Sequence, residues 1–207
     1  MELSILPYFI ITIPQFLPLR NKKSLSFPLP FLYKMCYKGA RCEDMENAYV
    51  FRQARQDEVK KIFDLIMERV SWMDQVGIHQ WNDTKYDERY PLSYYEMRRQ
   101  RGELFVLEQA GELLCVGALF HEDERWPDRS NAYYLHHFAS AVDHKGMGTV
   151  FLDEAEKYTK AQGKTYMRLD SAIGNKALEE YYTSRGYTEA GRCTDGLYKG
   201  ILRQKKL

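Results

Sequence analysis

Two glycines separated by one residue, Gly146 and Gly148, stand where phosphate-binding chemistry could occur. An aromatic, apolar stretch at 131–141 predicts a buried strand before them, and residues 150–162 place apolar side chains at helical spacing after them. The first amides of such a helix lack internal acceptors, and glycines leave room for an anion to approach. A site for a phosphate-bearing ligand is one interpretation of this turn. A tight connection without a ligand is the other.

The spacing of the turn excludes two common phosphate-binding motifs. A dinucleotide fingerprint needs a third glycine three residues after Gly148, where the sequence has Phe151. A P-loop needs Gly-Lys before Ser or Thr, whereas Gly148 directly precedes Thr149.

The elements that would position the turn alternate between strands and helices. Asp57 is the expected N-cap of the first helix, and a turn at 193–196 contains the Asp195-Gly196 hairpin dipeptide. The order predicts an α/β layer arrangement with a mixed sheet. Strands are expected at 49–54, 104–109, 113–120, 131–141, 165–171, 187–192 and 197–203, and helices at 59–73, 91–101, 150–162 and 175–185.

The composition is typical of one globular domain with a sizeable core. The 207 residues carry a net charge of +1, so no excess charge favours nucleic acid or an anionic membrane as a partner. The cysteines at 36, 42, 115 and 193 show no metal-ligand spacing, and neither a metal site nor a disulfide framework is predicted. Cys115 lies in an apolar run and is interpreted as a reduced core residue, which points to a cytoplasmic protein.

Residues 1–46 differ in composition from the rest, and we expect an N-terminal extension outside a domain that spans 47–207. Residues 4–19 are apolar, but three prolines interrupt them and they are too short to span a membrane. Glu2 is the only early charge, so a secretory signal peptide is not indicated. Met45 would make a natural domain start, so one interpretation is that the start codon was placed too far upstream. The other interpretation is a membrane-surface anchor, because an apolar stretch of this length can lie in a membrane interface.

Two blocks of residues occur at a specific separation. The first is Gly146-Met147-Gly148 after the fourth strand, and the second comprises Asn175, Tyr182 and Gly186-Tyr187 on the last helix. Together they resemble the GNAT superfamily of acetyl-CoA-dependent N-acetyltransferases, over residues 48–203. The resemblance implies a mixed, mostly antiparallel central sheet with helices on both faces. It also implies transfer of an acetyl group from acetyl-CoA to a primary amine of a small molecule or peptide.

The resemblance further implies where acetyl-CoA, the co-substrate, would bind. Its pantetheine arm would pair with the backbone of Phe138, Ala139 and Ser140 like an added strand. Asn175 would hold an amide of the arm, although its position also suits a helix N-cap. The pyrophosphate would lie on the amides of His144, Lys145, Gly146, Met147, Gly148 and Thr149.

One position departs from the family pattern. Asp143 replaces a common Arg or Gln, and the loop is about two residues short. We therefore expect Asp143 to face solvent and His144 or Lys145 to supply the positive charge.

The resemblance assigns catalysis to a proton donor and a base. Tyr182 suits the donor to the departing thiolate, the alternative being a packed core tyrosine. His136 and His137 are neighbours on one strand, so their side chains should face opposite sides. We favour His136 as the base because it should share a face with Tyr134 and Phe138, and the acids at 122–124 could act through water instead. No cysteine has an activating neighbour, which favours direct transfer in a ternary complex.

The acceptor amine would be bound between the first two helices. Its walls would be Trp72, His79, Gln80, Trp81 and Tyr86, which could equally form a satellite core under a long loop. The short, Asp-containing loop also suits a non-catalytic acyl-CoA-binding regulatory domain. A homodimer through the aromatic-rich surface is a further possibility.

Overall fold

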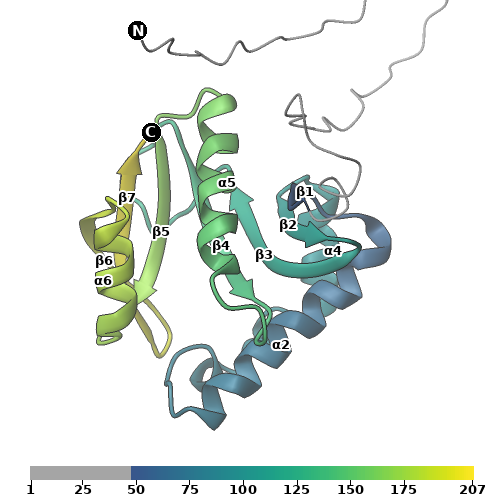
Figure 1. Ribbon diagram of the computed structural model, residues 1–207. Helices are drawn as coiled ribbons and strands as arrows, with labels where there is room; N and C mark the ends of the chain where they lie inside the picture. Colours follow the sequence, from purple (N-terminus) through teal and green to yellow (C-terminus); the bar gives the residue numbers. More distant parts are fainter. Residues whose placement is uncertain (1–47) are drawn as a thin grey trace, which may run out of the picture. The chain divides into compact units, whose positions relative to one another are not determined.

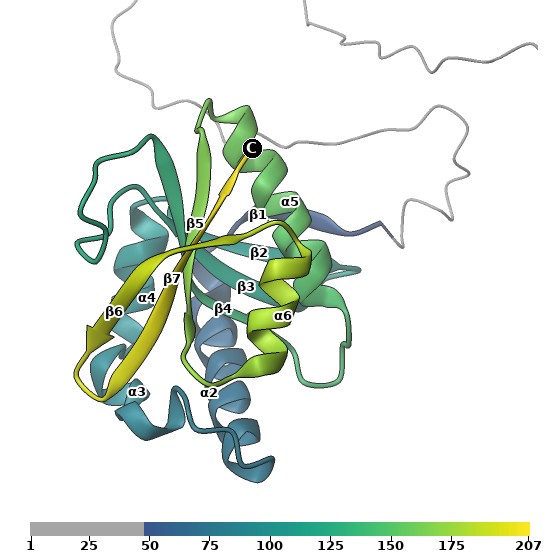
Figure 2. The same cartoon turned by 90° about the vertical axis from the view of Figure 1, so that its left-hand side faces the viewer.

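A computed structural model describes residues 48–207, and the expectations for residues 1–46 lie outside this range. The described chain contains seven strands in one sheet, with helices between them (Figures 1 and 2). The elements are β1 (Val50–Gln53), η1 (Gln56–Glu58), α2 (Val59–Gln75), η2 (Asn82–Thr84), α3 (Tyr86–Arg89), α4 (Leu92–Gln100), β2 (Leu104–Gln109), β3 (Glu112–Phe120), β4 (Ala132–Ser140), α5 (Met147–Ala161), β5 (Tyr166–Ala172), α6 (Lys176–Ser184), β6 (Thr188–Asp195) and β7 (Tyr198–Lys206).

The sheet is mixed and mostly antiparallel, as predicted, and its strands lie in the order β1-β2-β3-β4-β5-β7-β6. Only β4 and β5 pair in parallel, and α5 connects them. Their pairing ends at Leu135 and Leu169, although β4 continues to Ser140 and β5 to Ala172. Beyond this point the two strands diverge, and Figure 1 shows the opening between them.

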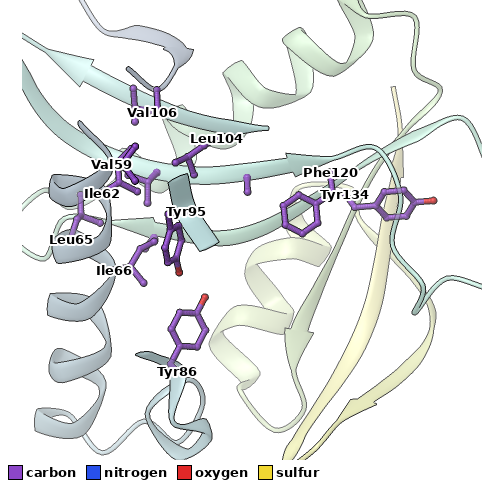
Figure 3. Packing of buried hydrophobic residues seen from close by; sticks show 14 of the residues in the cluster. Val59, Ile62, Leu65, Ile66, Tyr86, Tyr95, Leu104, Val106, Phe120 and Tyr134 are labelled. Atoms are coloured by element: carbon purple, nitrogen blue, oxygen red, sulfur yellow. The ribbon is translucent and has the colours of Figure 1, made fainter. Parts of the chain in front are cut away.

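Helices cover both faces of the sheet, because its central strands carry apolar side chains on both faces that must be buried. Leu104 and Val106 of β2 pack into the cluster formed with α2 and α4, whereas Phe105 and Leu107 pack into the cluster formed with α5 and α6. This alternation follows from the two-residue period of a strand. Figure 3 shows the first cluster, in which Ile62 and Ile66 of α2 face the sheet.

Three local predictions were wrong. Asp57 does not cap the first helix, because residues 56–58 form η1 and the Glu58 carboxylate instead accepts a hydrogen bond from the Arg55 amide. The helix expected from residue 150 begins at Met147, so Gly148 lies within its first turn. Asp195 pairs with Tyr198, which leaves Gly196 and Leu197 as a two-residue turn in place of the expected four residues.

Glycines follow two of the helices, and the interpretation of Cys115 as a reduced core residue was confirmed. Gly163 and Gly186 adopt left-handed backbone conformations after α5 and α6, with φ of 72° and 85°. Cys115 is a fully buried free thiol. Within residues 48–207, no helix is long and apolar enough to cross a membrane, and no cluster of His, Cys, Asp and Glu could hold a metal ion.

Candidate functional site

A cavity of about 430 Å³ lies where β4 and β5 diverge, and it brings together most of the residues that could do chemistry. One wall is β4 from Leu135 to Ser140, and the opposite wall comprises Leu169 and Asp170 of β5 with one side of α6. At one end lie Gly146, Gly148 and Thr149, and at the other lie α3 and the segment before it. Unpaired strand edges and a helix N-terminus therefore meet in one cleft.

A β-bulge in β4 shapes the centre of this cleft. Val116 pairs with Ala139 and Ala118 with His136, so that His137 and Phe138 together oppose Gly117. His137 has a φ of 51°, which is uncommon for a residue with a side chain. The extra residue shifts the alternation of the strand by one position.

The bulge overturns the expectation that the two histidines face opposite sides of the sheet. Both rings contact Phe120, with centroids 4.4 Å away for His136 and 6.0 Å away for His137, and both residues line the cavity. His136 shares a face with Tyr134 but not with Phe138, which packs on Phe151 of α5.

The edge of β4 that faces the cleft is narrower than predicted. The Ala141 amide donates to the Leu114 carbonyl, Ala139 pairs with Val116, and the Cys115 thiol donates to the Ala139 carbonyl, so the backbone of Ala139 and Ala141 faces β3. Phe138 and Ser140 alternate with them and face the cleft. Arg69 already donates to the Ser140 carbonyl, with Nε 3.0 Å from the oxygen. Phe138 and the Ser140 amide therefore provide the available edge.

The turn before α5 offers unpaired amides. Gly146 has a φ of 85°, and its carbonyl accepts hydrogen bonds from Thr149 and Val150, which start the helix. The amides of Lys145, Gly146 and Gly148 donate to no acceptor within residues 48–207. A Cβ at Gly146 would meet no atom within 4 Å, so open space lies beside this turn. The arrangement suits an anion.

The side chains of the turn do not supply the expected positive charge. His144 Nε2 lies 3.0 Å from Glu112 Oε1, outside the cavity. Neither Lys145 nor Met147 lines the cavity, and Met147 packs against the core. Asp143 is exposed, as expected. Neither His144 nor Lys145, from which we expected the positive charge, therefore contributes its side chain to the lining of the cavity.

The last helix presents two predicted residues to the cleft. Asn175 caps α6 by accepting from the Leu178 amide at 3.1 Å, which leaves its side-chain NH₂ able to donate. Tyr182 lies 5 % exposed in the wall, and within the described chain its hydroxyl has no hydrogen-bond partner. Burial raises the pKa of Tyr182 above its ordinary value, so the phenol stays protonated.

His136 belongs to a charged network beside the cavity. Arg125 Nη2 lies 2.8 Å from His136 Nδ1, and Asp123 Oδ2 lies 3.1 Å from Nε2. Because arginine only donates and a carboxylate only accepts, Nδ1 is the acceptor and Nε2 carries the proton. Although burial opposes ionisation, hydrogen bonds from His136 and Arg125 hold the pKa of Asp123 well below its ordinary value.

The network continues to the other side of the cleft. Arg125 Nη1 lies 2.9 Å from Asp170 Oδ1, and the Tyr198 hydroxyl donates to Asp170 Oδ2 at 2.6 Å. Arg89 pairs with Asp195 at 2.7 Å and so links α3 to β6. These contacts join the acceptor end of the cavity to both of its walls.

Most of the predicted acceptor wall lines the cavity. Trp72, Gln80, Trp81 and Tyr86 are present there, with the Trp81 and Tyr86 rings stacked at 4.8 Å. Tyr86 also belongs to the hydrophobic core, so the wall and the satellite core are the same structure. His79 does not line the cavity, because its ring is 77 % exposed and contacts Asp83.

The sequence did not indicate four polar residues of the cavity. Arg125 lies in a charged loop, and we expected the side chains of this loop to be solvent-exposed. Tyr198 lies in a strand that extends further than expected. Asp170 ends a predicted strand, a position that could have identified it. Arg69 looked like an exposed helical residue, yet it stacks on Trp72 at 4.7 Å and donates to the end of β4.

Comparisons with known proteins agree with this geometry. The model of the acetyltransferase (GNAT) family matches residues 59–187. No curated protein matches the chain significantly. A GNAT-family acetyltransferase structure from Listeria monocytogenes is 25 % identical, with a TM-score of 0.65, and the alignment covers 77 % of this chain and 95 % of that one.

Two further solved structures share the fold at lower identity. The PaiA N-acetyltransferase of Thermoplasma acidophilum, in complex with coenzyme A, is 19 % identical with a TM-score of 0.61, over 77 % of this chain and 99 % of that one. YncA of Salmonella typhimurium, with its cofactor acetyl-CoA, is 20 % identical with a TM-score of 0.55, over 77 % and 94 %.

Proposed function

This chain belongs to the acetyltransferase (GNAT) family, and on that premise we propose that it transfers the acetyl group of acetyl-CoA to a primary amine of a small molecule or peptide. The observation that carries the proposal is the cleft between β4 and β5, which has free amides at one end and the Tyr182 hydroxyl in its wall. Two proteins of this fold were solved with coenzyme A or acetyl-CoA, which supports acetyl-CoA as co-substrate.

The residues of the cleft fit acetyl-CoA. The amides of Lys145, Gly146 and Gly148 would hold the pyrophosphate, with the positive end of the α5 dipole behind them. His144, Met147 and Thr149 belong to the same turn, so their contacts would be through the backbone. Phe138 and Ser140 would pair with the pantetheine amides, and the Asn175 side chain would donate to a carbonyl of the arm.

Acetyl-CoA supplies an activated acetyl carbonyl and a thiolate leaving group. A backbone amide of β4 would donate to the carbonyl oxygen, where negative charge develops. Tyr182 would donate its proton to the departing sulfur, because its hydroxyl is protonated and has no competing acceptor in the described chain.

His136 is proposed as the base that takes the ammonium proton of the acceptor. The Asp123 carboxylate fixes the tautomer that leaves Nδ1 as the acceptor, the form that a base requires. Arg125 now occupies that lone pair, so the acceptor amine must displace the Arg125 contact. Trp72, Trp81 and Tyr86 would enclose the body of the acceptor, and His79 lies outside this wall.

Direct transfer in a ternary complex fits the described cysteines better than an acyl-enzyme does. Burial raises the pKa of both the Cys115 and the Cys193 thiols, and neither residue lines the cavity. A thiol without thiolate character is a poor nucleophile.

Calorimetric titration of the full chain with acetyl-CoA and CoA tests the cofactor half of the proposal. We expect binding of both in the micromolar range. Binding without transfer to any amine would favour the second candidate, a non-catalytic acyl-CoA-binding domain. Two observations support that candidate: Asp143 brings a negative charge to the turn, and the His144 side chain contacts Glu112 and not the cavity. No binding at all would exclude both.

A cytoplasmic location and a homodimer are further parts of the proposal. The buried, free Cys115 supports a reducing compartment. Exposed Leu197 at the β6–β7 turn is compatible with a contact between copies. Light scattering of the purified chain tests the dimer, and a monomeric mass at micromolar concentration would exclude it.

A further inference from the structure

His137 combines an unfavourable backbone conformation with a buried polar ring. Its φ of 51° lies in the left-handed region, which residues other than glycine adopt uncommonly. The residue is 8 % exposed, and the chemistry proposed above uses neither of its ring nitrogens. A strained, buried residue at the centre of a cleft requires contacts that hold it in place.

Two tyrosine hydroxyls provide those contacts. Tyr86 Oη of α3 lies 2.5 Å from His137 Nδ1, and Tyr94 Oη of α4 lies 2.9 Å from Nε2. Burial lowers the pKa of His137 well below its ordinary value, so the ring is neutral. A neutral imidazole has one donor and one acceptor, so one tyrosine donates to the ring while the other accepts from it. The ring orientation is thereby fixed from two helices.

Aromatic packing closes this arrangement, which we name the His137 clamp and define as His137, Tyr86 and Tyr94. The ring of Tyr90 crosses that of His137 at 73° with a centroid distance of 4.7 Å. Tyr95 lies 5.5 Å away on another side of the ring, and its hydroxyl forms no hydrogen bond with His137. The clamp therefore joins β4 to α4 and to α3, which carries Tyr86 of the proposed acceptor wall.

The bulge is also fixed from the opposite strand. A Cβ at Gly117 would lie 2.8 Å from the Phe151 ring and 2.9 Å from Leu135, so only glycine fits opposite the bulge. A register slip would move another residue into this space. Gly117 thus sets where the bulge lies, and the clamp sets how His137 is turned within it.

We propose that His137 is a positioning residue, whose clamp aims the following backbone amide, that of Phe138, at the acetyl carbonyl. The inference rests on the proposed function, because it concerns how the same cleft polarises the acetyl group. Phe138 lies directly after the left-handed residue, and it alternates with Ala139 and Ala141, which pair with β3, so its backbone lies on the side of the cleft. A rotation of the His137 backbone would therefore turn this amide away from the carbonyl.

Tyr94→Phe tests the clamp without changing the lining of the cavity, because Tyr94 does not line it. Tyr95→Phe is the matched control, since it also removes one hydroxyl from the same helix and ring cluster. The probe is acetyl-CoA labelled with ¹³C at the carbonyl and bound to the full-length variants. Isotope-edited infrared spectroscopy reports how strongly a hydrogen bond polarises that carbonyl.

We expect the bound carbonyl of the wild type and of Tyr95→Phe to absorb at lower frequency than free acetyl-CoA. In Tyr94→Phe the shift should shrink and kcat should fall roughly tenfold, as misaligned catalytic groups produce, with acetyl-CoA affinity unchanged. His137→Gly, which tolerates the same φ without a ring, should lose the shift as well. An unchanged carbonyl frequency in both Tyr94→Phe and His137→Gly would overturn the inference.

The infrared readout separates this inference from the proposed function. If the wild type polarises the carbonyl but acetylates no amine, the transferase proposal fails while the clamp stands. If it acetylates an amine and Tyr94→Phe matches the wild type in both frequency and kcat, the clamp fails while the transferase proposal stands.

Discussion

At the scale of single residues, Tyr182 and His136 differ in the hydrogen bonds that their side chains already make. The Tyr182 side chain lines the cavity, and its hydroxyl has no hydrogen-bond partner in the described chain, so it is available to a bound thioester. Both ring nitrogens of His136 are engaged, by Arg125 and Asp123. The proposed proton donor, Tyr182, is therefore available before substrate binds. The proposed base, His136, can accept a proton only after its contact with Arg125 breaks.

Replacing Tyr182 by Phe should lower kcat about 100-fold, the loss typical of a missing general acid, while acetyl-CoA affinity stays constant. The hydroxyl holds no other described side chain in place, so its removal should not disturb the fold. Tyr187→Phe is the control, since Tyr187 is an adjacent buried ring that donates to Glu156 away from the cavity. Steady-state kinetics test whether Tyr182 is the proton donor. An equal kcat for Tyr182→Phe and the wild type would exclude Tyr182 from that role.

His136→Gln should abolish the acid limb of the pH dependence of kcat/KM, because that limb reports the protonation of the base. Glutamine retains a polar group beside Asp123 but does not titrate. A profile measured from pH 5 to 9 with an unaltered acid limb would show that another group accepts the proton.

Asn175 caps the start of α6 and Tyr182 follows seven residues later, about two helical turns on, so both side chains line the cavity, while their roles in binding and catalysis stay predictions. The sequence could not predict the orientations of His136 and His137. Those depend on a bulge opposite Gly117, which pairs from a strand distant in sequence.

At the scale of elements, α5 connects the fold to the proposed function. Its N-terminus carries the free amides of the cleft, and Gly163, with a φ of 72°, follows Gln162 at its C-terminal end. Substitutions at the two ends should therefore separate ligand binding from stability.

Gly148→Val should weaken acetyl-CoA binding roughly tenfold or more, equivalent to a loss of about 1.4 kcal/mol of binding free energy, because the valine side chain would shield the backbone amides from the pyrophosphate. The fold should tolerate the substitution, since a Cβ at this position approaches only Phe138, at 3.5 Å.

Gly163→Ala should instead lower the free energy of unfolding by about 1 kcal/mol, because alanine is strained in the left-handed conformation, and it should leave acetyl-CoA binding intact. Calorimetry and urea denaturation of both variants measure the two effects, and equal binding by all three proteins would contradict this assignment.

Elements with local signals were predicted well, and elements fixed by distant pairing less well. The β2–β3 hairpin was found because Ala110 and Gly111 form a tight turn between alternating strands. The β6–β7 turn was misplaced because Asp195 is held in the strand by its pairing with Tyr198, and its side chain is held by Arg89. Neither contact is visible in the Asp-Gly dipeptide alone.

At the scale of the described domain, buried titratable groups connect stability to pH. Burial lowers the pKa of His137, so at mildly acidic pH the unfolded chain binds a proton that the folded chain does not. The stability that His137 contributes is therefore present above its unfolded pKa and is lost as pH falls. The depressed pKa of Asp123 adds a second loss under strongly acidic conditions.

Between pH 7 and 5.5, the free energy of unfolding should fall by about 1 kcal/mol from His137 alone. Urea denaturation at several pH values measures this slope. His137→Gly should flatten it, whereas His79→Gln, a change at an exposed ring, should not. A wild-type stability independent of pH in this range would contradict the buried, neutral state of His137.

The central claim is that the cleft transfers an acetyl group to an amine. The most direct measurement incubates the full chain with acetyl-CoA and a panel of primary amines, and follows released CoA thiol together with the masses of the amines. The account predicts thiol release that depends on one class of amine and on Tyr182, with one acetyl group added to that amine. Saturable acetyl-CoA binding with no amine-dependent release across the panel would contradict it.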